Sequence, residues 1–110
     1  MPGIADKTDL PVILSEAAIS DLSELGSWIA RQAGSEIAED YVARVETACE
    51  RLGTFPNRGT PRFDVEAGLR TVTYRRKVVI AYLVDEAGVQ VLRLIDSSRD
   101  FARAFGEANG

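Results

Sequence analysis

Two helical apolar stripes, one on each side of Gly34, constrain the fold of this chain more than any other feature. The first stripe has apolar side chains at helical spacing, namely Ala18, Leu22, Leu25 and Ile29. The second stripe repeats the pattern with Ile37, Tyr41, Val45, Ala48 and Leu52. Ser15 is a suitable N-cap for the first helix, Gly34 is expected to end it, and Ser35 is expected to cap the second. Two amphipathic helices joined by about two residues predict an antiparallel helix hairpin.

On either side of the hairpin the periodicity is that of β-strands. A short apolar run at residues 11–15 precedes the first helix, and strand-like runs follow at residues 69–74, 78–84 and 89–95. Arg75-Arg76 and residues 85–88 are expected to be the hairpin turns between those runs. The resulting order β-α-α-β-β-β predicts an α+β fold with two layers, in which the helix hairpin covers an antiparallel sheet.

The remaining segments lack strand or helix periodicity over most of their length. Residues 53–68 form a loop of a length that is often functional. Residues 1–10 contain Pro2 and Gly3 and are expected to be a flexible leader. Residues 97–107 carry apolar side chains at a spacing compatible with a short C-terminal helix. A chain of 110 residues suffices for one hydrophobic core, so residues 11–110 are expected to form a single domain.

The sequence contains no histidine, which excludes a Ser-His-Asp triad, an imidazole base and a histidine-ligated metal. Its one cysteine, Cys49, cannot form a disulfide framework or a cysteine-rich zinc site, and we expect it to be a small buried hydrophobe. We therefore expect no cofactor and no metal. The sequence has neither a long apolar run that would cross a membrane nor the apolar region of a signal peptide, so a cytoplasmic location is expected.

The charge of the chain is acidic overall and unevenly distributed. The net charge of −4 argues against direct binding of nucleic acid by this chain alone. The first 55 residues carry four basic and ten acidic side chains, whereas residues 56–110 carry nine basic and seven acidic ones. The second half is therefore weakly basic and would attract an anionic or acidic partner.

A set of basic side chains in the second half is the best candidate for chemistry, and it comprises Arg70, Arg75, Arg76, Lys77 and Arg99. Guanidinium groups bind phosphate or carboxylate through paired hydrogen bonds. The alternative is that these charges only solvate a hairpin turn, and the pattern leaves both open.

The predicted sheet has more apolar residues than one covered face requires. Both alternating sets of residues 78–84 are apolar, whereas a sheet with one face in water alternates cleanly. Either the loop and the C-terminal segment fold over the second face, or that face is an apolar strip for a partner chain. Arg93, on the mixed face of the last strand, would favour an acidic partner.

Most aromatic side chains are expected to pack. Trp28 and Tyr41 lie on or near the helical stripes and are expected in the core. Tyr74 and Tyr82 alternate along strands and are also expected to pack, although Tyr74, close to the arginines, is also placed to stack on a partner ring or a base.

Taken together, these residues resemble the RelE/ParE superfamily, the small toxins of bacterial toxin–antitoxin operons. The resemblance covers about residues 11–100 and is carried, in order, by Val12-Ile13-Leu14-Ser15, Asp21-Leu22, Trp28-Ile29-Ala30, Pro56, Gly59, Gly68-Leu69-Arg70, Val78-Val79-Ile80-Ala81-Tyr82, Val91-Leu92-Arg93 and Arg99-Asp100. It implies a β-α-α-β-β-β toxin that is held inactive by an antitoxin, whose C-terminal tail wraps around it.

Within the superfamily the chain is most similar to the ParE-like branch. That similarity implies inhibition of DNA gyrase by protein–protein contact, no catalytic residues, and neutralisation by a ParD-like antitoxin. The implied target contacts are Arg70, Arg75, Arg76, Arg93 and Arg99. The implied antitoxin contacts, along the helix hairpin and the free sheet face, are Trp28, Tyr74, Val79, Tyr82, Val91 and Arg93.

Two alternatives remain open at this point. A RelE-like toxin would cleave mRNA in the ribosome, commonly with a tyrosine or histidine near the C-terminus. Here Phe101 and Phe105 occupy that segment, and a phenyl ring cannot transfer a proton. Members of the superfamily are often basic, whereas this chain is acidic, which leaves open a non-toxic module that only binds an antitoxin.

Overall fold

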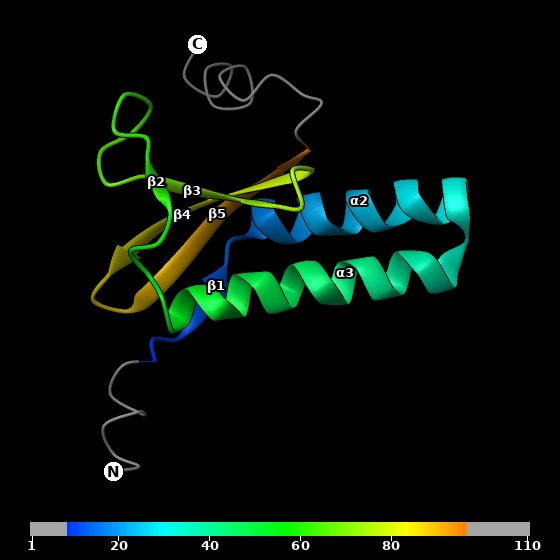
Figure 1. Cartoon of the computed structure of the whole chain (residues 1–110), viewed down its shortest axis with the longest axis horizontal. Helices are drawn as coiled ribbons and strands as arrows, with labels where there is room; N and C mark the ends of the chain where they lie inside the picture. The colour runs from blue at the N-terminus through cyan, green and yellow to red at the C-terminus, as the bar shows by residue number, and fades with distance from the viewer. Residues whose placement is uncertain (1–8, 97–110) are drawn as a thin grey trace.

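The computed structural model describes residues 9–96, and in these the predicted two-layer α+β architecture is confirmed (Figure 1). The elements in chain order are β1 (Val12–Leu14), α2 (Glu16–Ala33), α3 (Ser35–Glu50), the short 3₁₀ turn η1 (Arg51–Gly53), β2 (Thr60–Pro61), β3 (Arg70–Tyr74), β4 (Val78–Asp85) and β5 (Gly88–Asp96). The predicted C-terminal helix, Arg99 and residues 1–8 of the predicted leader lie outside the described residues.

The sheet is mixed, with the strand order β1-β5-β4-β3-β2. Strands β3, β4 and β5 form the predicted antiparallel meander, but β1 lies parallel to β5, with Val12 opposite Val89. The amide of Val89 donates to the carbonyl of Pro11 (2.9 Å), and the amide of Ser15 donates to the carbonyl of Val91 (2.9 Å). Because β1 has only three residues, it pairs with the first part of the β5 edge only. Among the described residues, the backbone groups of β5 beyond Val91 have no strand partner on this side.

The predicted loop 53–68 contains one further strand, β2, which pairs with Arg70 and Thr71 of β3. The buried phenol of Tyr82 fixes this loop to the sheet through two hydrogen bonds. Its hydroxyl donates to the carbonyl of Pro56 (2.8 Å) and accepts from the amide of Gly59 (3.0 Å). A Cβ atom at position 59 would lie 2.6 Å from that hydroxyl, so only glycine fits there.

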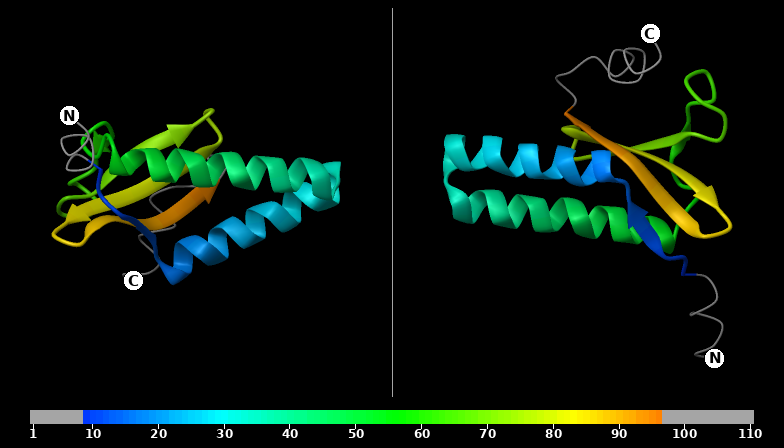
Figure 2. Two further views of the ribbon diagram at one scale, coloured as in Figure 1. Left: turned by 90° about the horizontal axis from the view of Figure 1, so that it is seen from below. Right: turned by 180° about the vertical axis from the view of Figure 1, so that it is seen from behind.

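Helices α2 and α3 run antiparallel on one face of the sheet, and their connecting end projects beyond the strands (Figures 1 and 2). Ser15 caps α2 as predicted, because its hydroxyl accepts from the amide of Ala18 (3.0 Å). Gly34 ends α2 at φ 98°, a region that glycine adopts readily. The predicted Ser35 cap is wrong: Gly34 is also the N-cap of α3, and α3 has no side-chain capping bond.

The hydrophobic core lies between the helices and the sheet. Its buried members are Ala18, Leu22, Val45, Cys49, Leu52, Val78, Ile80, Tyr82, Val89, Val91 and Leu94. Burial is therefore confirmed for Cys49 and Tyr82, and Tyr41 packs against the core while partly exposed. The prediction that Trp28 is a core residue is wrong, since it is 52% exposed, and Ile37 is 57% exposed. Both residues are close in sequence to Gly34, at the connecting end of the hairpin, and Trp28 lines a groove together with Val78, Leu94 and Asp96.

The second face of the sheet is partly covered. Ala81 and Ile95 are buried, whereas Val79 and Leu83 keep partial exposure. The loop before β3 contributes to this cover, because a Cβ atom at Gly68 would lie 3.6 Å from Cδ2 of Leu83. The described part of this face is therefore not a continuous exposed apolar strip. Within residues 9–96, neither helix combines the length and the apolar character that crossing a membrane requires.

Candidate partner-binding surfaces

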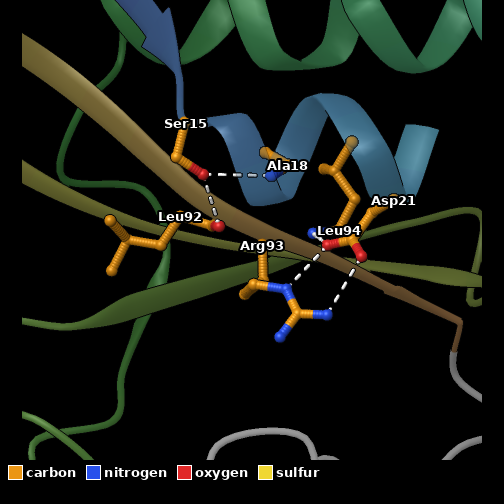
Figure 3. A network of polar contacts seen from close by, with 6 residues as sticks. All are labelled: Ser15, Ala18, Asp21, Leu92, Arg93 and Leu94. Atoms are coloured by element: carbon orange, nitrogen blue, oxygen red, sulfur yellow. Dashed lines mark hydrogen bonds and ion pairs between the residues drawn. The ribbon is translucent and has the colours of Figure 1, made fainter. Parts of the chain in front are cut away.

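The free part of the β5 edge is closed by side chains from the start of α2 (Figure 3). The Asp21 carboxylate accepts from Nε and Nη2 of Arg93 (2.8 and 3.0 Å) and from the backbone amide of Leu94 (2.9 Å). The Ser15 hydroxyl donates to the carbonyl of Leu92 (2.8 Å). These groups occupy the donors and acceptors that an added strand would need, so this stretch of the edge is protected against strand addition.

Arg93 reaches this edge because β5 contains an irregularity. Ala81 of β4 lies opposite Arg93 while Tyr82 lies opposite Val91, so Leu92 has no partner and forms a β-bulge. The hydrogen bond with Asp21 raises the pKa of the Arg93 guanidinium, opposed by partial burial. Arg93 therefore joins the helix layer to the sheet, and its charge is already neutralised within the chain.

An apolar groove runs between the two helices, and we call it the hairpin groove. Its volume is about 530 Å³, and it is lined by Ile19, Leu22, Ser23, Gly26, Ser27, Ala30, Ser35, Ala38, Glu39 and Val42. The helices approach closely at its centre, where a Cβ atom on Gly26 would lie 3.1 Å from Cγ2 of Val42. Ile19 is 56% exposed at the groove, and Trp28 and Ile37 are exposed on the same two helices. The hairpin thus presents apolar side chains to solvent.

The arginines predicted as target contacts are not gathered at one place. Nη1 of Arg70 donates to the carbonyls of Gly59 (2.9 Å) and Asn57 (3.2 Å), so this side chain fixes the loop before β2. Arg75 and Arg76 form the predicted tight turn between β3 and β4, with φ of 49° and 60°. Both are exposed there, and Arg93 lies on the opposite side of β4 from β3.

Among the predicted antitoxin contacts, some are accessible and some are not. Trp28 is exposed, and Val79 and Tyr74 are partly exposed. Tyr82 and Val91 are fully buried beneath the helices, because both point to the helix-covered face of the sheet. A partner cannot touch these two side chains in the folded protein, so we correct the predicted contacts at both positions.

A second groove, lined by four arginines, was missed by the sequence reasoning, and we call it the arginine groove. Its volume is about 440 Å³, and it lies between the C-terminal half of α3, η1 and β3, with the lining residues Ala43, Arg44, Thr47, Ala48, Arg51, Leu52, Arg58, Val72, Thr73, Tyr74, Arg75 and Ile80. The available signal was the spacing of Arg44 and Arg51, seven residues apart, which places them on one face of a helix. Arg58 and Arg75 join them only through the tertiary fold.

Three side chains that can exchange a proton, those of Cys49, Tyr41 and Tyr82, are buried or partly buried. Burial raises the pKa of the Cys49 thiol to about 12, so the thiol is neutral. Burial also raises the pKa of Tyr41, and the Tyr82 hydroxyl is engaged with backbone groups of the loop. Within residues 9–96 there is no group of three metal-ligating side chains.

Comparison with known proteins agrees with this architecture. The model of the family "ParE toxin of type II toxin-antitoxin system, parDE" matches residues 12–101. Toxin ParE3 of Caulobacter vibrioides is 28% identical over 96 residues, which cover 87% of this chain and 95% of that toxin. A solved structure of the chromosomal ParDE system from P. aeruginosa has the same fold, with a TM-score of 0.71 and 22% identity over 81% of this chain and 97% of the other. Because the family model matches most of its length, the chain belongs to the ParE toxin family of type II toxin–antitoxin systems.

Proposed function

We propose that this protein inhibits DNA gyrase by protein–protein contact and that a ParD-like antitoxin neutralises it. The observation that supports this most is the match of the ParE toxin family to residues 12–101, which contain the whole described sheet and hairpin. In this proposal the protein acts in the cytoplasm as a single domain over residues 11–110, next to the DNA and the gyrase that it affects.

For the antitoxin we propose the hairpin groove as the main docking surface. An amphipathic helix binds such a groove by placing its apolar side chains at helical spacing into it. The exposed Ile19 supplies an apolar contact in the groove, Trp28 supplies a further one on α2 outside the groove, and Gly26 and Ala30 keep the floor of the groove shallow. Covering these side chains removes apolar surface from water, which stabilises the complex by about 25 cal/mol per Å² buried.

For the target we propose the turn between β3 and β4. Arg75 and Arg76 are exposed there, and Arg70 and Arg93 contact the loop carbonyls and Asp21 elsewhere on the sheet. Both turn residues have positive φ, a backbone conformation that costs a non-glycine residue about 1 kcal/mol. The presence of two arginines in a turn of this conformation is consistent with a role in recognition.

A non-catalytic mechanism fits the described residues better than RNA cleavage. Cleavage of RNA requires a group that accepts or donates a proton next to the reacting hydroxyl. The Tyr82 phenol is buried and hydrogen-bonded to the backbone, and the raised pKa of Cys49 keeps its thiol protonated. An inhibitor that acts by contact needs neither group.

The test is to incubate the purified protein with gyrase, ATP and supercoiled plasmid and to measure cleaved DNA after denaturing the enzyme. We expect cleaved DNA to accumulate with toxin concentration, and an Arg75→Glu, Arg76→Glu double variant to lose most of this effect. Arg31→Glu, an exposed charge reversal on α2, is the matched control. Cleavage of mRNA in translating ribosomes, without any effect on gyrase, would instead establish the RelE-like alternative.

A further inference from the structure

We propose that the arginine groove binds the phosphate backbone of duplex DNA without reading its sequence. The groove is lined by Arg44, Arg51, Arg58 and Arg75, and no carboxylate from residues 9–96 lines it. That this duplex is the one held by gyrase rests on the proposed function, but the chemistry of the groove does not. The toxin would then contact the DNA of the gyrase complex as well as the enzyme.

Positive charge is concentrated at this groove, although the whole chain has a net charge of −4. All four arginine side chains are exposed. Arg51 and Arg58 form no salt bridge with any described residue. Arg44 pairs with Asp40 (2.8 Å), but both side chains are exposed, and such a surface pair adds little stability. The groove therefore offers guanidinium groups to an anion from outside the chain.

The floor of the groove strengthens the attraction of these charges for an anion. Leu52 and Ile80 are buried there, and Val72 is partly exposed beside them. An apolar floor has a low dielectric constant, so it screens the field of the arginines less than water would. Salt at physiological concentration screens exposed charges that lie more than about 8 Å away. Local charge at the groove therefore matters more for binding than the net charge of the chain.

The basic surface is too long to serve a single small anion. Arg44 and Arg51 are seven residues apart on α3 and its C-cap, which places them about 10 Å apart along the helix axis. Arg75 extends the groove to the turn between β3 and β4, where Arg76 and Lys77 are also exposed. Each strand of a duplex presents a phosphate about every 3.4 Å of axis, so one duplex can contact several of these side chains at once. An acidic peptide would have to lose conformational freedom before it could do the same.

The groove is suited to the backbone of a duplex rather than to unpaired bases. Binding of a single strand relies on aromatic faces that stack on bases. Tyr74 is the one aromatic residue among the described residues that line the groove, and the Arg75 guanidinium lies over its ring, 5.5 Å from the centroid. Its ring also makes an edge-on contact with Tyr41, with centroids 5.9 Å apart. Contacts to phosphate carry no sequence information, so we expect binding that does not depend on sequence.

The experiment titrates a fluorescein-labelled duplex of mixed sequence with the full-length protein and measures fluorescence polarisation at several salt concentrations. We expect a dissociation constant of about 10⁻⁴ to 10⁻⁵ M at physiological salt, typical of nonspecific binding, and tighter binding at low salt. The logarithm of the association constant should fall linearly with the logarithm of the salt concentration. A slope of about −2 to −4 corresponds to roughly two to four phosphate contacts. A second duplex of unrelated sequence should bind equally well.

Arg51→Ala and Arg58→Ala each remove one expected phosphate contact. Each variant should lose about three- to tenfold in affinity, and its salt slope should become shallower by about 1. Arg31→Ala on α2 removes the same charge from a residue outside the groove and is the matched control, which should keep the wild-type slope. Circular dichroism checks that each variant is folded.

The proposal fails if no duplex binds at low salt, or if the groove variants keep the affinity and slope of the wild-type protein. Displacement of the duplex by polyglutamate as effectively as by unlabelled duplex, at equal concentration of charge, would assign the groove to an acidic peptide instead. Tighter binding of a single strand than of the duplex would contradict recognition of the duplex backbone. None of these measurements involves gyrase, so failure here and failure of the gyrase assay are distinguishable.

Discussion

Asp21 on α2 and Arg93 on β5 form a bidentate ion pair. The distance from Nε of Arg93 to Oδ2 of Asp21 is 2.8 Å, and that from Nη2 of Arg93 to Oδ1 of Asp21 is 3.0 Å. The residues are 72 positions apart in sequence, and the same carboxylate also accepts from the amide of Leu94. Asp21 is only 10% exposed. One side chain therefore joins the helix layer to the sheet and satisfies an edge amide that β1 is too short to reach.

We expect Asp21→Ala to lower the free energy of unfolding by about 2–4 kcal/mol. The substitution leaves the partly buried Arg93 and the Leu94 amide without their acceptor, and loss of one partner of a buried pair is costly. Urea denaturation followed by circular dichroism measures the effect. Asp40→Ala, which removes the exposed pair with Arg44, is the control and should cost less than about 1 kcal/mol. Equal losses in the two variants would show that the Asp21 network adds no more than a surface ion pair.

We expect Tyr82→Phe to lower the free energy of unfolding by about 1–3 kcal/mol. The variant keeps the ring in the core but removes the hydroxyl that bonds Pro56 and the buried amide of Gly59. Thermal unfolding of the variant measures this loss. Tyr41→Phe serves as the control, since its ring lies at the edge of the core and is partly exposed. An unchanged stability in Tyr82→Phe would show that the loop does not depend on this anchor.

Local patterns in the sequence predicted much of this fold, because they report on neighbouring residues. The helical stripes, the Ser15 cap and the turn at Arg75-Arg76 all depend on short-range geometry, and the structure confirms them. The pattern did not reveal that the hairpin projects beyond the sheet (Figure 1), and it wrongly placed Trp28, which is 52% exposed, in the core. How far a helix extends past its sheet depends on strand lengths and register, which periodicity does not encode.

The candidate sites were predicted less well, for a related reason. Arg70 and Arg93 were grouped with the turn arginines by charge, but their partners, the loop carbonyls and Asp21, are distant in sequence. The β-bulge at Leu92 turns the Arg93 side chain toward the sheet edge. No residue type in β5 predicts this bulge. The arginine groove likewise arises only when α3 and β3 come together.

We expect the Cys49 thiol to react slowly with a disulfide reagent at about pH 8 in the folded protein and quickly after unfolding. Its pKa is raised to about 12 by burial, so little reactive thiolate forms. Between pH 9.0, the ordinary pKa of a cysteine thiol, and about pH 12, the thiol ionises in the unfolded chain but not in the folded one. Stability should therefore fall as pH rises through this window, by up to about 1.4 kcal/mol per pH unit.

The Cys49→Ala variant is the control for this pH dependence. It should show a shallower loss of stability across the same alkaline window, because the remaining groups titrate as before. Identical slopes in the variant and the wild-type protein, together with rapid labelling of the folded chain, would contradict the buried, neutral thiol.

We expect the fluorescence of Trp28, the only tryptophan in the sequence, to report directly on partner binding. In the free protein its indole is 52% exposed and should emit at the long wavelength of a hydrated ring. Binding of the antitoxin along the hairpin should shift the emission to shorter wavelength, and Ile19→Asp should weaken that binding without unfolding the protein. A partner that binds tightly and leaves the emission unchanged would place the interface elsewhere.

Growth of cells that express this chain, with and without the protein encoded by the neighbouring reading frame, tests the central claim most directly. The account predicts that the chain alone arrests growth and that co-expression of its antitoxin restores it, with the two proteins co-purifying. Unimpaired growth of cells that accumulate the folded chain alone would contradict a toxin and leave only an antitoxin-binding module.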